Sequence, residues 1–403
     1  MGGGVVMKKV LFALVFVVLA SMVLAAGIPS WDEVVAKAKK EGKVVWYGYG
    51  AEWDKMFYKS LAKEFEKEYG IKVEYVHGSW FDAIQKLIAE KKAGKKVSSF
   101  DLVFTWSVPF KQAWDAGVVW KYPIAYVVPN ARNVVDAGLL EYTDMIPTHG
   151  TFLPFVWWQV AFLYNKEKVK DPPKSLDDLL DWVKKHPGRF TYSDPNKGGS
   201  GHTFLITIIE WLYGYDKYYG AECTEDVVKS WYKKSPKGYS LWEYLNELEK
   251  YMYQPGTYPA GNSAAMELFA RGIVWLEPQW LDVTAEWVKE GRVDPNIVGM
   301  YIPEPTIDAG GFDGLFIPAK APHKYAAMVL ANFLLSKKVQ KDLVVKRGGI
   351  YPVVKGVWEE IPESVKNQPY YVPLEEVTKN LWFRHGECME KAMKLWVDEV
   401  VRK

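Results

Sequence analysis

The sequence has little of what metal and redox sites need. Six histidines and two cysteines occur in 403 residues, and none shows the His-x-x-x-His or Cys-x-x-Cys spacing typical of a bound metal ion. There is also no Asn-x-Ser/Thr acceptor for an N-linked sugar. We therefore expect neither a metal nor a cofactor.

An excess of charge of one sign is missing as well. The chain has 51 lysines and arginines against 49 acidic residues, a formal net charge of +2. Residues 1–26 contain two lysines and no acid, so the chain without them is formally neutral. A balanced charge argues against nucleic acid as a partner, because phosphate backbones are bound by basic surfaces.

After its first residues the chain has no segment that is long and apolar enough to cross a membrane. The apolar run at residues 10–26 follows Lys8 and Lys9 and precedes small residues, which predicts a secretory signal peptide. Its 17 residues are marginal for a membrane span, so an uncleaved N-terminal anchor is the alternative. No cysteine follows the run, which excludes a lipid anchor on cysteine. We expect the protein at the outer face of the cell membrane, secreted or tethered.

Cys223 and Cys388 are the two cysteines of the chain. Outside the cell such a pair can form one disulfide. Their separation in sequence does not define their distance in space, so the pairing stays open.

Aromatic residues are what the chain has in abundance. They make up 15% of the sequence, with 19 tryptophans and 25 tyrosines. Most are expected to fill cores, and 403 residues exceed the size of a single core and favour two lobes. The remainder can line a cleft between those lobes.

Buried strands alternate with helices in the first part of the chain. Strands are expected at residues 43–47, 71–76 and 102–105, with a helix after each of the first two. Later in the chain, strands are expected at residues 189–192 and 273–276, the second preceded by a helix that Ser263 caps. Such alternation predicts an α/β fold with a mostly parallel sheet and right-handed crossovers. Ligands of such sheets bind beyond the carboxyl ends of the strands, which points to the loops at residues 48–53 and 106–109.

One stretch in mid-chain predicts a passage between two lobes. Residues 152–166 form an almost uninterrupted apolar and aromatic run, which is typical of a strand buried on both faces. Pro172 and Pro173 follow it, and Ser175 with Asp178 supplies the capping pattern of a helix start.

The segment Ala-Phe-Leu-Tyr-Asn-Lys at residues 161–166, followed by Pro-Lys-Ser-Leu-Asp-Asp-Leu at 173–179, resembles the crossover of one family. These are the solute-binding proteins of ABC importers, in the larger two-lobed kind that includes maltose-, thiamine-, polyamine- and ferric-ion-binding members. Further segments follow in the order of that family, at residues 88–94 and 100–104, 263–266 and 272–275, and 317–322 and 331–340. The likeness is nearest to a branch whose ligands are unassigned.

The resemblance implies a type II periplasmic-binding-protein-like fold, in which each lobe is a mostly parallel sheet flanked by helices and crossover strands join the two. The expected parts are lobe 1 at residues 27–158 and 306–350, lobe 2 at 159–305, and a C-terminal helical segment at 351–403 that packs on the lobes. The resemblance also implies a monomer, not an enzyme, that captures a small polar solute and delivers it to ABC permease subunits. Its lobes are expected to rock about crossings near Gln159, Pro305 and Tyr351.

The expected ligand contacts end strands or line the loops between crossings. They are Tyr47, Tyr49, Trp53, Trp106, Trp158, Tyr192, Asp194, Ser200, Gly201, Thr203, Glu277, Gln279, Trp280, Asp313 and Tyr351. Aromatic faces attract organic cations and carboxylates add to the attraction, but the same kinds of residue also bind sugars. We favour an organic cation or similar nitrogenous solute, thiamine- or polyamine-like, with an oligosaccharide as the alternative.

Two motifs suggest other chemistry but lack a component. Gly48 and Gly50 begin a dinucleotide-binding fingerprint, and Trp53 stands where its third glycine is needed. The glycines around Ser200 suggest a hydrolase nucleophile, but His202 stands where the last glycine of that motif belongs.

Other function classes stay open at this point. A secreted hydrolase acting on carbohydrate needs two facing carboxylates, which Glu277 and Asp313 can supply if folding brings them together. A surface adhesion module predicts a flat aromatic face and no lobe closure. The ferric-binding members use paired tyrosines, and Tyr218-Tyr219 is such a pair, which we interpret as structural because it lies in a polar insertion.

Overall fold

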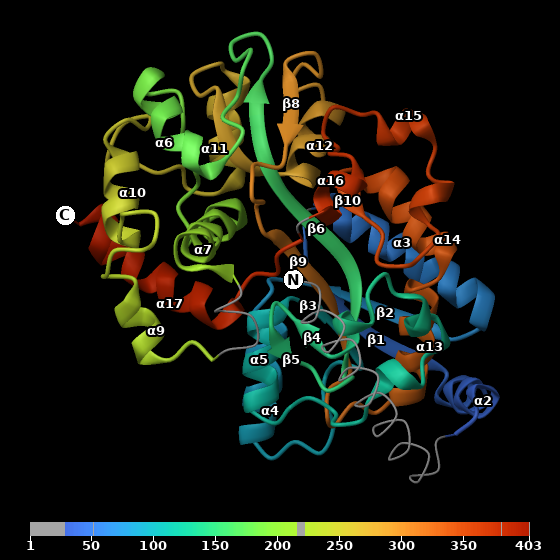
Figure 1. Ribbon diagram of the computed structural model, residues 1–403. Helices are drawn as coiled ribbons and strands as arrows, with labels where there is room; N and C mark the ends of the chain where they lie inside the picture. Colours follow the sequence, from blue (N-terminus) through green and yellow to red (C-terminus); the bar gives the residue numbers. More distant parts are fainter. Residues whose placement is uncertain (1–28, 51, 216–221, 380, 403) are drawn as a thin grey trace, which may run out of the picture.

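The computed structural model describes residues 29–402 except 51, 216–221 and 380. Within these residues the chain forms two α/β lobes that share one long strand (Figure 1). The predicted signal segment and Tyr218-Tyr219 lie outside the described residues. No helix in the described part is both long and apolar enough to span a membrane.

The first lobe is built on three parallel strands. β1 (Lys43–Gly48) pairs with both β2 (Lys72–His77) and β3 (Leu102–Thr105), and α3 (Glu52–Tyr69) and α4 (Asp82–Lys92) connect them. The three strands expected from the alternation are therefore confirmed. α2 (Trp31–Glu41) precedes β1, and α5 (Ser107–Asp115) follows β3. Because the three strands are parallel, their carboxyl ends meet at one edge of the sheet.

The long strand β6 (Phe152–Asn165) belongs to both lobes and confirms the predicted crossing. Its first half pairs with β9 (Ala309–Phe316) and β10 (Ile350–Tyr351), and its second half with β7 (Leu276–Trp280) and β8 (Val298–Tyr301). These four pairings are antiparallel, and β9 returns to the first lobe in the direction opposite to β6. β9 also pairs with β3, so the eight strands form one continuous sheet.

Helix α7 (Gly199–Tyr213) is the centre of the second lobe, and all of its residues are buried. α6 (Leu176–Lys185) begins with the predicted cap, in which Asp178 N–H donates to Ser175 Oγ at 3.1 Å and Ser175 N–H donates to Asp178 Oδ2 at 3.2 Å. The lobe is completed by α9 (Glu225–Ser230), α10 (Leu241–Glu249), α11 (Asn262–Ala270) and α12 (Leu281–Lys289).

Three expected elements of the second lobe differ from those found. Residues 189–192 form no strand, and Phe190 makes a single bridge to Leu276. The strand expected at residues 273–276 begins at Leu276 and ends at Trp280, because residues 276–280 are the ones in register with β6. The helix expected to be capped by Ser263 begins at Asn262 and has Gly261 as its N-cap, so Ser263 lies inside its first turn.

The last part of the chain covers both lobes. Its elements are α13 (Lys324–Leu334), α14 (Lys337–Asp342), η4 (Leu343–Arg347), α15 (Glu363–Lys366), α16 (Leu374–Lys379), α17 (Gly386–Trp396) and η6 (Val397–Val401). Val377 of α16 is part of the hydrophobic core of the first lobe, whereas Met389 and Trp396 of α17 are part of the core around α7. The residue limits of the lobes given above stay a prediction.

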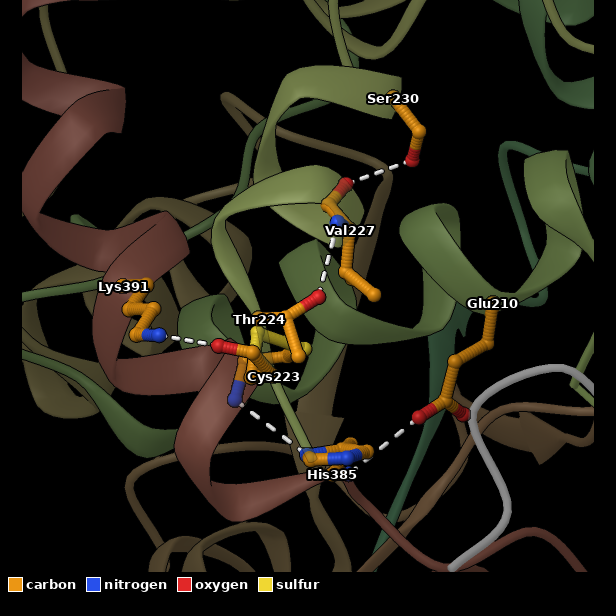
Figure 2. Close-up of a disulfide and its surroundings, with 8 residues drawn as sticks. Glu210, Cys223, Thr224, Val227, Ser230, His385 and Lys391 are labelled. Atoms are coloured by element: carbon orange, nitrogen blue, oxygen red, sulfur yellow. Dashed lines mark hydrogen bonds between the residues drawn. A yellow bond between two sulfur atoms is a disulfide. The ribbon is translucent and has the colours of Figure 1, made fainter. Parts of the chain in front are cut away.

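Cys223 and Cys388 form a disulfide, which the sequence had left open (Figure 2). It joins the loop before α9 to the first turn of α17, 165 residues apart. Lys391 donates a hydrogen bond to the carbonyl oxygen of Cys223, and Cys388 N–H donates to His385 Nδ1 at 3.3 Å. The C-terminal helix is therefore covalently attached to the second lobe.

Candidate ligand-binding site

A cavity of about 600 Å³ lies between the two lobes. This is within the range of small-molecule sites, about 300–1,000 Å³. We call it the cleft, and its lining is Tyr49, Gly50, Asp54, Gly78, Ser79, Trp80, Trp106, Trp158, Lys197, Gly199, His202, Ala260, Gly261, Asn262, Ser263, Trp280, Asp282, Val283, Glu286, Trp287, Arg292, Asp313, Arg347 and Arg384. The lining includes loops that follow β1, β2 and β3, which agrees with the rule for ligand sites of parallel sheets.

Aromatic rings form a continuous wall on one side of the cleft. Tyr49 stacks on Phe104 at 4.8 Å between ring centroids and on Trp80 at 6.2 Å. Trp80 contacts Trp106 at 5.8 Å, and Trp106 stacks on His202 at 6.0 Å. The wall thus extends from the end of β1 to the first turn of α7, and its π-faces suit a flat or cationic ligand.

Asp313 is the carboxyl group nearest to this wall. It lies on β9, and the hydroxyl of Tyr49 donates a hydrogen bond to its Oδ2. Burial raises the pKa of Asp313 to about 7, although hydrogen bonds from Tyr49 and Trp158 and the charge of Arg384 act in the opposite direction. The carboxyl group therefore changes charge near neutral pH.

A second group of carboxyl side chains surrounds Arg347. Its Nε donates to Asp54 at 3.0 Å, its Nη2 donates to Asp282 at 2.8 Å, and Nη2 lies 3.6 Å from Glu286. Burial raises the pKa of Asp282 to about 6 and also raises that of Glu286. One guanidinium thus faces three carboxyl groups, because the chain brings α3, α12 and η4 together here.

Most of the positive charges in the lining are paired with carboxylates that lie outside the cleft. Three of the four pair with carboxylates that do not line the cleft: Lys197 with Asp194 at 3.4 Å, Arg292 with Glu290 at 3.3 Å, and Arg384 with Asp144 at 2.9 Å. Of the four carboxyl groups of the lining, Asp54, Asp282 and Glu286 share the remaining base, Arg347, and Asp313 is the fourth. Once they ionise, the cleft therefore carries an excess of negative charge, which favours a cationic ligand.

Five of the residues predicted to contact the ligand line the cleft. They are Tyr49, Trp106, Trp158, Trp280 and Asp313. Two of them come from the predicted loops after β1 and β3, two from the crossing strands, and Trp280 from the end of β7. The contacts with a ligand stay a prediction.

The other predicted aromatic residues point into the protein. The hydroxyl of Tyr47 donates to the carbonyl oxygen of Ser79 at 2.7 Å, and the ring of Trp53 stacks on Phe57 at 5.0 Å. Tyr192 accepts a hydrogen bond from Trp396 Nε1 at 3.0 Å, and Tyr351 donates to the carbonyl oxygen of Val372. None of these four lines the cleft, because their rings pack into or against hydrophobic cores instead.

The residues predicted in α7 and in the loop before it are also displaced from the cleft. Ser200 and Gly201 meet Ser193, whose Oγ lies 3.1 Å from Ser200 Oγ and accepts from Gly201 N–H at 3.0 Å. A Cβ on Gly201 would come within 1.9 Å of the carbonyl oxygen of Ser193, so this turn requires glycine. Thr203 is buried, and Asp194 pairs with Lys197. Helical periodicity turns Gly199 and His202 toward the cleft instead.

Glu277 and Gln279 are buried inside the second lobe. Gln279 Nε2 donates to Glu277 Oε1 at 3.0 Å, and burial raises the pKa of Glu277 to about 8. Alternation along β7 places both side chains on one face, whereas Trp280 lines the cleft. Glu277 therefore does not face Asp313 across the cleft, and the carboxylate pair required by the hydrolase alternative is not assembled.

Several residues that line the cleft are not among the ligand contacts predicted from the sequence. Trp80 follows β2, and the rule that pointed to the loops after β1 and β3 would have found it. Asp282, His202, Arg347 and Arg384 had no such signal. The two arginines reach the cleft from the last 60 residues, and nothing local to them indicates a ligand site.

A two-lobed α/β protein with an aromatic and acidic cleft between its lobes is, by class, a binding protein for small solutes. The chain belongs to the bacterial extracellular solute-binding proteins, whose family model matches residues 60–371. This confirms the resemblance seen in the sequence. Members of this family bind small solutes outside the cytoplasm, work with permease components of ABC importers, and are binding proteins rather than enzymes.

Curated relatives agree on the family and differ in ligand. The chain is 27% identical to Protein YnjB of Escherichia coli over 327 residues, covering 79% of this chain and 80% of the relative. It is 23% identical to the spermidine/putrescine-binding periplasmic protein of Escherichia coli over 371 residues, covering 89% and 91%. It is 30% identical to the thiamine-binding periplasmic protein of Haemophilus influenzae over 166 residues, covering 35% and 46%.

Solved structures confirm the periplasmic-binding-protein-like fold. The apo ferric ion-binding protein A of Pasteurella haemolytica matches with a TM-score of 0.61 and 17% identity, covering 89% of this chain and 98% of that one. The spermidine/putrescine-binding protein PotD of Streptococcus pneumoniae matches with a TM-score of 0.65 and 16% identity, with the same coverage.

Proposed function

We propose that this protein is the substrate-binding component of an ABC importer that captures an organic cation or similar nitrogenous solute, thiamine- or polyamine-like. The observation that carries the proposal is Asp313, a buried carboxyl group beside stacked aromatic rings in a cleft where carboxyl groups outnumber uncompensated bases. A cationic group beside Asp313 keeps the carboxylate ionised and gains cation–π contacts of about 0.5–2 kcal/mol each.

Capture and delivery follow from motion of the lobes. We propose that they rock about the crossings near Gln159, Pro305 and Tyr351, with lobe limits as predicted from the sequence. At the first crossing, Gln159 Nε2 donates to the carbonyl oxygen of Asp308 at 3.3 Å, which links the outgoing and returning segments. A ligand that contacts both walls of the cleft stabilises the closed form, and the permease responds to that form. The protein acts as an extracytoplasmic monomer and performs no covalent step.

Native mass spectrometry of gently purified protein, followed by isothermal titration calorimetry, would identify the ligand. We expect a nitrogenous cation to co-purify, and thiamine or spermidine to bind more tightly than maltotriose. Trp280→Ala and Tyr49→Ala should weaken binding of that cation at least fivefold without unfolding the protein, consistent with the loss of about 1 kcal/mol or more. Tyr232→Ala, an exposed ring outside the cleft, serves as the control. Unchanged affinity in both cleft variants would discard the site.

An oligosaccharide is the second candidate, since the stacked rings of Tyr49 and Trp80 also suit a sugar face. Tight binding of maltotriose with no response to cations would favour it. Turnover of glycosides by the purified protein would favour the hydrolase instead, whereas stoichiometric binding with compaction in solution scattering supports the importer subunit.

A further inference from the structure

Two side chains that line the cleft each carry a buried N–H group that has no acceptor among the described residues. The groups are Nε1 of Trp106 and Nε of Arg384, and both atoms are shielded from solvent. Both side chains line the cleft, and the Arg384 side chain is only 2% exposed. A buried donor without an acceptor costs about 1–3 kcal/mol, so each would be stabilised by an oxygen atom placed beside it.

The same small cluster holds both donors in place. The guanidinium of Arg384 lies 5.9 Å from the ring of Trp106. Its Nη2 donates to Asp144 at 2.9 Å, while its Nη1 donates to His202 Nε2 at 3.3 Å and to Thr203 Oγ1 at 3.4 Å. The Nε atom of the same guanidinium has no hydrogen-bond partner among the described residues.

The charges of this cluster are already balanced. Asp144 compensates Arg384, and burial together with Arg384 lowers the pKa of His202 to about 3, so this imidazole is neutral at physiological pH. The cluster therefore offers hydrogen-bond donors without a net charge. It can donate hydrogen bonds to the oxygen of a hydroxyl or a carboxylate on a molecule that carries a positive charge elsewhere.

We propose that Trp106 and Arg384 form an oxygen-binding subsite of the cleft, which takes a hydroxyl or carboxylate oxygen of a ligand whose cationic group lies beside Asp313. The inference rests on the proposed function and narrows its substrate class to amino alcohols, zwitterions and related cations that carry an oxygen acceptor. The ligand reaches the two donors while the lobes are apart, and closure then buries the hydrogen bonds.

Three matched probes test the subsite by titration calorimetry: choline, glycine betaine and ethyltrimethylammonium, which share a quaternary ammonium group and differ in the oxygen. We expect choline or betaine to bind at least tenfold more tightly than ethyltrimethylammonium, as one or two such hydrogen bonds predict. Trp106→Phe keeps the ring and removes the N–H, so it should reduce this advantage to threefold or less. Arg384→Lys keeps a charge beside Asp144, removes Nε–H, and should do the same.

Trp182→Phe is the matched control, because its buried Nε1 also lacks an acceptor but lies outside the cleft. It should leave all three affinities unchanged. Equal affinities of the three probes, or an advantage that persists in Trp106→Phe, would overturn the subsite while leaving the cation site intact.

The indole ¹⁵N–H resonances give a readout that does not depend on the cation. Acetate or either oxygen-bearing probe should shift the Trp106 resonance, whereas ethyltrimethylammonium should shift that of Trp158. If no oxygen-bearing probe moves Trp106, the subsite is wrong. A different outcome is that no cation binds measurably or shifts the Trp158 resonance, while acetate still shifts that of Trp106. In that case the subsite stands and the proposed cationic ligand is wrong.

Discussion

The hydroxyl of Tyr49 donates a hydrogen bond to the carboxyl group of Asp313, although the two residues are 264 positions apart. Tyr49 follows the carboxyl end of β1, and Asp313 lies on β9, the strand that returns from the second lobe. Burial raises the pKa of both groups. The pair thus places a weakly acidic carboxyl group, held by a neutral phenol, in the cleft.

Binding of a permanent cation should become tighter as the pH rises. Because the pKa of Asp313 is raised to about 7, the group is mostly protonated at pH 6 and ionised at pH 8, and only the ionised form attracts the cation. We expect the affinity for a quaternary ammonium ligand to increase by about tenfold over this interval. Asp313→Asn should bind more weakly and show a flatter profile, as measured by titration calorimetry. A steep rise that persists in this variant would show that another group is responsible.

Tyr49→Phe should shift this rise in affinity to higher pH. The hydrogen bond from Tyr49 lowers the pKa of Asp313, so its removal makes ionisation of that carboxyl group harder. Binding of the same cation should weaken by about threefold to tenfold at pH 7 and recover at pH 8.5. An equal loss at both values would instead indicate direct contact between the hydroxyl and the ligand.

Gly199→Ala should disturb the cleft through Trp280. A Cβ at this position would lie 2.6 Å from Cζ2 of the Trp280 ring, so the ring has to move. We expect at least fivefold weaker ligand binding with a small change in thermal stability. In the background of Trp280→Ala the same substitution should have little further effect on affinity, since the ring it displaces is gone.

Loss of the disulfide should destabilise the protein strongly. The chain-entropy model assigns about 5 kcal/mol to a bridge that closes a loop of this length, and measured values are commonly 2–5 kcal/mol. The variant with both Cys223 and Cys388 replaced by serine should unfold at a temperature several degrees lower in calorimetry. Reductant should lower the unfolding temperature of the wild type and leave that of the variant unchanged; equal effects on both would contradict a structural role.

Two buried carboxyl groups, one on α7 and one just before β9, should make stability fall as the pH rises. Burial raises the pKa of Glu210 well above its usual value and that of Asp308 to about 7, and the charge of Asp308 raises the pKa of Glu210 further. Between pH 5 and 8 the folded protein therefore holds more protons than the unfolded chain, so the free energy of unfolding decreases. Asp308→Asn should flatten this decrease in chemical denaturation, whereas Asp226→Asn, an exposed control, should not.

Much of the fold could be predicted because its determinants are local. The apolar run of β6 is long enough to cross between lobes, and the Ser175–Asp178 cap involves residues three apart, so neighbouring residues alone specify both. The strand at residues 276–280 was misplaced because its limits depend on the register with β6, a partner more than 100 residues away.

The sequence by itself determined the two-lobed α/β class, the crossing strand and the family. Only the tertiary structure decided which aromatic residues line the cleft, because a tyrosine at the end of a strand can pack in a core, as Tyr351 does, or line a cleft, as Tyr49 does. It also brought Cys223 to Cys388, and Arg347 and Arg384 to the cleft. Side chains that meet through packing of distant helices leave no periodic or local pattern, so their encounter is specified by the whole chain.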